Sequence, residues 1–221
     1  MLVSSPTELT TSLTDAILAI ESLGILLVAF RGHRWHHRIW RWIFGLLAVS
    51  ALLGSIAHGL EMPANLRELL WKPLYLSLGM MLALFLVAAI ADWSDIATAK
   101  RLLPFSIATG AVFFTLTELF NGVFIVFILY EAIVMLSALL IYAFLAYAHH
   151  QPGAGIICAA ILINLLAAGV QSSDVSITLL IPFDHNGLFH LIQIVGTGLL
   201  GLGTYRIAEN KKTQDQVAYE A

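Results

Sequence analysis

Hydrophobic and polar stretches alternate along the chain at intervals that suit a lipid bilayer. A helix needs roughly 17 to 25 apolar residues to cross the hydrocarbon core, so the pattern predicts seven membrane-spanning helices. Charged or turn-forming segments separate most of them, among them the basic segment 31–38, the charged segment 61–72 and Asn121-Gly122. The predicted spans are 13–30, 39–60, 73–91, 103–119, 123–147, 154–172 and 187–208.

One apolar segment does not fit this series. The chain is apolar from Val175 to Phe183, but this stretch is too short to cross a bilayer and contains Pro182. We expect the whole segment 173–186 to form an interfacial lid or a re-entrant piece. The predicted fold class is therefore all-α: a single seven-helix membrane bundle that takes up the whole chain and ends in a short tail at 209–221.

Composition excludes an ordinary soluble protein. Hydrophobic residues make up 59% of the chain and charged residues 11%, whereas soluble chains average about 25% charged residues. A net charge of −3 without a large basic cluster argues against a nucleic-acid partner. Because Cys158 is the one cysteine, the chain cannot build a disulfide or a thiolate metal site by itself. Glu8, Asp15 and Glu21 precede or interrupt the first apolar run, so we expect no signal peptide.

Basic residues predict how the bundle is oriented. Cytoplasmic loops carry an excess of Lys and Arg, and only Arg67 and Lys72 lie on the same side as the N-terminus. We therefore expect an integral membrane protein with an extracytoplasmic N-terminus and a cytoplasmic C-terminus. Among Arg and Trp neighbours, His33, His36 and His37 favour an interfacial anchor over a metal site. The nine basic residues of the predicted cytoplasmic side are Arg31, Arg34, Arg38, Arg41, Lys100, Arg101, Arg206, Lys211 and Lys212.

Ionisable side chains inside membrane spans are costly and usually functional. In the predicted topology they collect in the outer half of the bundle, where Asp15, His58 and His190 come from three different spans. We predict that His58 and His190 lie at similar depth in one pocket, although 132 residues separate them. Residues three or four apart share a helix face, as do Asn186, His190, Gln193 and Thr197.

Histidines that converge in this way suit a catalytic metal. Three neutral imidazoles with an open fourth position are typical of catalytic Zn²⁺, which lowers the pKa of its bound water to about 7. The candidate ligands are His58, His185 and His190, with His185 joining from a position just before the last helix, where Asp184 is the candidate N-cap. A lone membrane histidine is more often a hydrogen-bonding group between helices. The carboxylates that could orient these imidazoles or transfer protons are Asp15, Glu21 and Glu61.

The seven spans and two short motifs resemble the CREST superfamily, which includes alkaline ceramidases, adiponectin-type receptors and haemolysin-III-like bacterial proteins. The motifs are Ser55 with His58 at the end of the second span and Asp-His-Asn-Gly-Leu-Phe-His at 184–190. The resemblance implies zinc held by one histidine of the second helix and two of the seventh. His58 and His190 match two of these ligands, and Ser55 matches a serine beside the site. The superfamily's serine sits four residues before its histidine, at the position of Gly54 here, and Asn186 replaces the first histidine of its last helix.

Taken together, residues and resemblance predict a zinc-dependent membrane hydrolase that cleaves an amide or ester bond of a membrane lipid, as ceramidases do. Its catalytic candidates are Ser55, Asp15 and Glu61, beside a metal held by histidines.

Two other function classes remain open at this point. His58 and His190 would also suit the axial ligation of haem in a membrane electron carrier. Glu21 and Glu131 would suit the proton relay of a transporter, or a non-enzymatic receptor. A retinal protein is disfavoured because the seventh span contains no lysine for a Schiff base.

Overall fold

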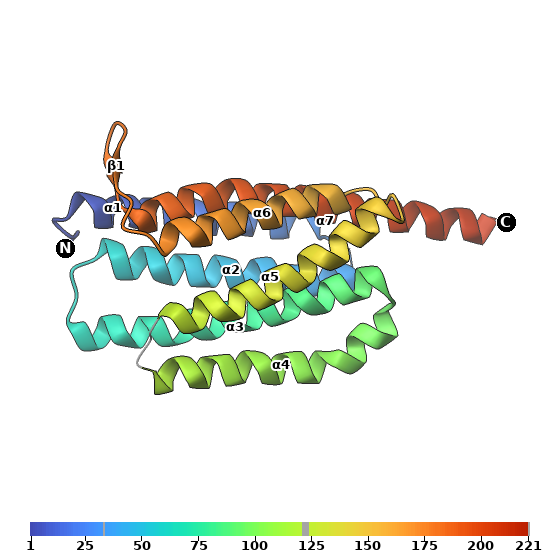
Figure 1. Cartoon of the computed structure of the whole chain (residues 1–221), viewed down its shortest axis with the longest axis horizontal. Coiled ribbons are helices and arrows are strands. Elements are labelled where there is room, and N and C mark those ends of the chain that lie inside the picture. Colours follow the sequence, from blue (N-terminus) through green and yellow to red (C-terminus); the bar gives the residue numbers. More distant parts are fainter. Residues whose placement is uncertain (33, 121–123, 221) are drawn as a thin grey trace.

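The computed structural model describes residues 1–32, 34–120 and 124–220, and it confirms the all-α class. Helix makes up 83% of it, and the seven described helices lie side by side along one long axis (Figure 1). By length and composition all seven could cross a membrane, as expected of an integral membrane protein. The elements are α1 (Pro6–Ala29), α2 (Trp35–Gly59), α3 (Ala64–Trp93), α4 (Ile96–Leu119), α5 (Phe124–Tyr147), α6 (Ala154–Gln171), β1 (Ile177–Thr178), β2 (Pro182–Phe183) and α7 (His185–Glu220).

Several helices are longer than the predicted spans. The helix α3 begins at Ala64 rather than at 73, α4 begins at Ile96, and α7 continues to Glu220. The apolar run marks the lipid-crossing part of a helix, whereas the helix itself continues until a cap or a breaker ends it. At the start of α4, Asp95 accepts hydrogen bonds from the Thr98 backbone N–H and from the Thr98 hydroxyl, both at 2.8 Å. These bonds, with smaller contributions from Ser94 and Ala97, lower the pKa of Asp95 to about 2. The predicted turn Asn121-Gly122 lies outside the described residues.

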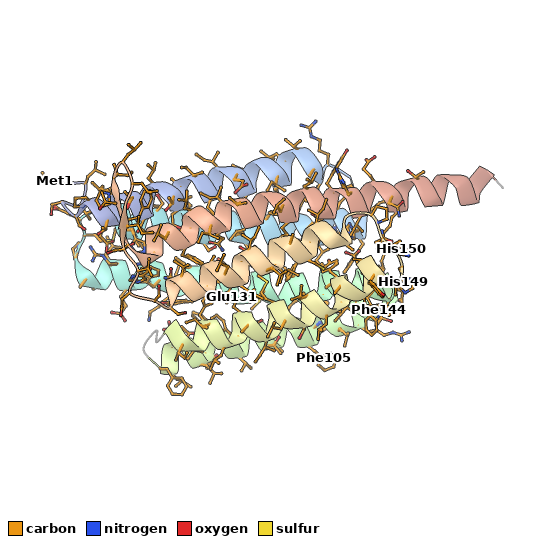
Figure 2. The ribbon with its side chains drawn as sticks, turned by 45° about the horizontal axis from the view of Figure 1, so that its top comes forward. Met1, Phe105, Glu131, Phe144, His149 and His150 are labelled. Atoms are coloured by element: carbon orange, nitrogen blue, oxygen red, sulfur yellow. The ribbon has the colours of Figure 1, made fainter. Side chains whose placement is uncertain are left out.

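Six helices form a closed ring, and one lies outside it. The helix α1 packs against both α2 and α7, and α3, α5 and α6 complete the ring, while α4 packs mainly against α3 at the edge of the bundle (Figure 1). Large apolar side chains also cover the outside of the bundle, as on a lipid-facing surface; Phe105 and Leu140 are examples. Figure 2 labels Phe105 on this outer surface.

The segment between α6 and α7 is a small antiparallel hairpin. Ile177 pairs with Phe183 and Thr178 with Pro182, and the hairpin projects sideways from the end of the bundle that carries the N-terminus (Figure 1). It stands outside the ring of helices, and its placement as an interfacial or a re-entrant piece stays a prediction.

A buried ion-pair cluster joins four helices at the opposite end of the bundle. The Asp92 carboxylate on α3 lies 2.8 Å from Lys211 Nζ on α7 and 3.0 Å from His36 Nε2 on α2. Tyr142 of α5 donates its hydroxyl proton to the other Asp92 oxygen at 3.0 Å. The side chain of Asp92 is only 1% exposed and His36 is buried, so the prediction of an interfacial anchor was wrong for His36.

The tight turn into α6 gives a direct test of the packing between α6 and α7. Gly153 has φ +92°, a left-handed conformation, and a Cβ there would meet the backbone oxygen of Gly203 on α7. We expect Gly153→Ala to lower the free energy of unfolding by about 1–2 kcal/mol from backbone conformation alone, with a further loss from the clash. Gly155→Ala is the matched control, because a Cβ at Gly155 meets nothing within 4 Å. Thermal unfolding of both variants in detergent tests this, and equal melting temperatures would contradict it.

Candidate functional site

The ring of helices encloses a cavity of about 360 Å³ at the end of the bundle that bears the hairpin. Its wall is partly apolar, with Leu18, Leu74, Met81 and Phe127 among the lining residues. The rest of the wall includes polar groups that come from five helices distant in sequence. These residues are Asp15 (α1), Ser50 and His58 (α2), Glu131 (α5), Asn164 and Gln171 (α6) and, on α7, His185, Asn186, His190, Gln193 and Thr197.

His58 is held in place by a carboxylate and an indole. Its Nδ1 lies 2.7 Å from Glu8 Oε2, and its ring meets Trp71 edge to face with centroids 5.5 Å apart. The Glu8 side chain is 42% exposed and that of His58 is 17% exposed, so this pair lies at the mouth of the site. A carboxylate that accepts the Nδ1 proton leaves Nε2 of the ring as the proton acceptor.

His190 forms the second pair, deeper in the bundle. Its Nε2 lies 3.3 Å from Asp15 Oδ1, and the two side chains are only 13% and 5% exposed. Nδ1 of His190 is buried and has no hydrogen-bond partner among the described residues. When Asp15 accepts the Nε2 proton, Nδ1 is left as the acceptor nitrogen of the ring, buried inside the protein.

The absence of a side chain at Gly54 makes room for the Asp15 carboxylate where α1 packs against α2. A Cβ at Gly54 would lie 2.6 Å from Asp15 Oδ2, closer than two such atoms can approach. Gly54 therefore lets the acid lie directly against the backbone of α2.

The start of α7 is fixed by side chains of neighbouring elements. Asp184 Oδ1 accepts hydrogen bonds from the Gly187 backbone N–H at 3.0 Å and from the Thr11 hydroxyl at 3.2 Å, which confirms the predicted N-cap. Gln171 of α6 donates to the Asn186 side-chain oxygen at 2.6 Å. These bonds bring His185, the first residue of α7, to the cavity wall.

The structure brings together four of the predicted site residues and separates two others. Asp15 and the three candidate histidines all line the cavity. Ser55 does not; its hydroxyl lies 3.3 Å from Ser12 Oγ of α1, and Ser12 donates to the Ser55 carbonyl. Glu61 is exposed beside the N-terminal residues, where its N–H donates to the Met1 carbonyl.

The two acids of the predicted proton relay are also separated. Glu131 is buried in the cavity wall (Figure 2 labels it on α5), and its Oε2 has no partner among the described residues. Glu21 lies farther along α1, where a Cβ at Gly198 of α7 would be 2.9 Å from its Oε1.

Sequence reasoning missed Glu8 as a site residue. It treated Glu8 only as a charge before the first apolar run. Glu8 precedes Asp15 by seven residues, two helical turns, so both acids lie on the same face of α1. That spacing could have identified the second carboxylate.

The histidines as arranged do not form a ready three-ligand metal site. Among the described residues, no group of three or more His, Cys, Asp or Glu side chains is placed to hold a metal ion. His58 and His190 each use one ring nitrogen on a carboxylate instead. Zinc therefore stays a prediction made from sequence.

The model of a family described as a family of unknown function, DUF6962, matches residues 10–209. No curated protein and no solved structure matches the chain.

Proposed function

The chain belongs to the DUF6962 family of unknown function, and from its cavity we propose that it is a membrane hydrolase that cleaves an amide or ester bond of a lipid. One observation carries the proposal. Two histidines from α2 and α7, each paired with a carboxylate of α1, line a single cavity whose remaining wall is largely apolar. A polar centre inside an apolar chamber suits a substrate with one reactive polar bond and a long acyl chain.

The deeper pair supplies the base in this proposal. Asp15 fixes the tautomer of His190, and in this proposal the site opens beside the buried Nδ1 when a substrate binds. Nδ1 can then take a proton from a water molecule while the water oxygen bonds to the substrate carbonyl carbon. The protonated imidazole then gives this proton to the leaving nitrogen or oxygen as the C–N or C–O bond breaks. No other reactant is needed, because water is consumed and an acid and an amine or alcohol are released.

Charge that develops on the carbonyl oxygen needs a hydrogen-bond donor. Gln193 and Thr197 follow His190 by three and seven residues, on the same face of α7, and both line the cavity. An amide N–H or a hydroxyl from these residues would stabilise the oxyanion. Stabilisation of this charge is often the largest single contribution to such catalysis.

The experiment that tests this function uses purified protein in lipid nanodiscs with a panel of N-acyl and O-acyl lipids, ceramide among them. Mass spectrometry of released fatty acid is the readout. We expect release from at least one lipid class with wild-type protein. No release from any of them, with or without added zinc, would contradict the proposal.

Zinc is tested separately, because the acid–base scheme does not depend on it. Zinc bound to these histidines would supply a Lewis acid for the carbonyl and lower the pKa of water. We expect stoichiometric zinc in wild-type protein and its loss in His190→Ala if the resemblance holds for the metal. An absorption scan of the same preparation for a Soret band tests haem, the other cofactor that paired histidines suit.

Proton-coupled transport is the second candidate, and Glu131 favours it. A buried carboxyl without a partner in a membrane cavity is typical of a proton-binding site. Proton-driven uptake into proteoliposomes that is lost in Glu131→Gln, without any lipid hydrolysis by the wild type, would favour transport over hydrolysis.

We also propose that the cavity end of the bundle faces the outside of a bacterial inner membrane. Nine of the 11 basic residues lie towards the other end or in the tail, as the positive-inside rule expects of the cytoplasmic side. A cysteine at exposed Asn65, in a Cys158→Ala background, tests this in intact cells. An impermeant maleimide should label it there, and labelling only after cell lysis would reverse the orientation.

A further inference from the structure

The hairpin between α6 and α7 carries an apolar surface that the bundle does not bury. No charged residue occurs between Asp174 and Asp184. Leu180 at the tip is 99% exposed and Leu179 is 63% exposed, with Ile177 and Ile181 also exposed beside them. Uncovered leucines at the tip of a hairpin are unfavourable in water, so this surface needs a partner.

The base of the hairpin is fastened to the bundle. Thr10 of α1 donates its hydroxyl proton to the Pro182 carbonyl at 2.9 Å. Phe183 is buried, and Asp184 is bonded to Thr11 and caps α7. The hairpin is therefore a fixed arm whose direction is set by α1 and α7.

The direction in which the hairpin projects indicates that its partner is the membrane. The arm points sideways from the end of the bundle, roughly perpendicular to the membrane-spanning helices, so it runs parallel to the membrane surface (Figure 1). The two helices that the hairpin connects also expose apolar side chains, among them Leu166 on α6 and Leu191 on α7. An apolar arm that leaves the ends of two membrane-crossing helices sideways lies at the membrane surface, where its side chains can enter lipid.

We propose that the hairpin 175–183 is an interfacial anchor, with its Leu179-Leu180 tip inserted into the same bilayer that the seven helices cross. The partner is the headgroup and upper acyl layer of the membrane. Since the hairpin runs directly into His185 and Asn186 of the cavity wall, lipid held by the anchor lies beside the mouth of the site. The proposal does not rest on the chemistry proposed for the cavity.

Depth-dependent fluorescence quenching tests the anchor in the full-length protein. A Cys158→Ala background with Leu180→Cys is labelled with an environment-sensitive fluorophore and reconstituted into phosphatidylcholine–phosphatidylglycerol vesicles. Asn65→Cys, exposed at the same end of the bundle on α3, is the matched control. We expect lipids with a nitroxide near the headgroup to quench the label at 180 about threefold more strongly than the label at 65, and aqueous iodide to show the reverse order.

Two results would overturn the proposal. Equal iodide quenching at 180 and 65, with little quenching by nitroxide lipid, would place the tip in water. Protection of the label at 180 from both quenchers, lost when the protein is diluted with excess lipid, would assign the surface to a second copy of the chain. Because Leu180 makes almost no contact with the rest of the protein, its replacement should leave the fold intact, and gel filtration checks this.

Discussion

Lipid hydrolysis about 10²- to 10⁴-fold below that of the wild type is the expected result of replacing His190 with glutamine. Glutamine keeps the volume and some hydrogen bonding but cannot shuttle a proton. Asp15→Asn is expected to lose a similar factor, because an amide that donates to Nε2 fixes the wrong tautomer of the ring. The double variant should lose little more than either single one, since the two side chains act as a unit.

The control for this series is Ser55→Ala. It tests whether hydrolysis depends on the side chains that line the cavity or on the serine that the resemblance matches. Ser55 is a catalytic candidate from the sequence, matched by the resemblance to a serine beside the site, but its side chain packs against Ser12 of α1 outside the cavity. We expect its activity to stay within about twofold of the wild type, because no proton transfer depends on this hydroxyl. A loss as large as that of His190→Gln, in a protein with unchanged thermal unfolding, would contradict the His190–Asp15 assignment.

Loss of the buried acid at the other end of the bundle is expected to have the largest effect on stability. Asp92→Ala should lower the free energy of unfolding by about 3–5 kcal/mol, because it leaves Lys211 and His36 without their shared carboxylate. The same change frees the Tyr142 hydroxyl inside the protein. Thermal or denaturant unfolding in a mild detergent measures this.

A paired variant shows whether the cluster acts through charge. Asp92→Asn combined with Lys211→Met removes both charges and keeps most of the packing. We expect it to be considerably more stable than Asp92→Ala, since replacing a whole buried ion pair is often close to neutral. If the paired variant and Asp92→Ala unfold together, packing rather than charge explains the loss.

The fold was largely predictable from the sequence because a bilayer imposes a simple rule. Apolar runs of the length of a membrane crossing must be helices, and all seven were found. The rule does not show how far a helix continues into the polar residues on either side of an apolar run. For this reason α3 and α7 are longer than predicted. Nor could it show that His36 points into the bundle, since His36 lies in a segment rich in Arg and Trp and its partner Asp92 is 56 residues away.

The sequence predicted which histidines lie at the candidate site, but not which carboxylate each histidine contacts. Helical spacing placed His190 on one face of α7 and topology placed His58 at the same end. Which acid meets which histidine depends on how α1 rotates and slides against α2 and α7, which no local pattern encodes. Ser55 shows the same limit, because a one-residue shift along α2 turns a side chain by about 100° and here directs it towards Ser12.

The close approach of Asp15 to Gly54 couples two positions that lie on different helices. Any side chain at position 54 would begin with a Cβ only 2.6 Å from Asp15 Oδ2, so it would displace the acid that meets His190. A substitution at position 54 is therefore expected to be tolerated best when position 15 carries a smaller side chain. The two positions should behave as one unit, with an effect of the double change smaller than the sum of the single ones.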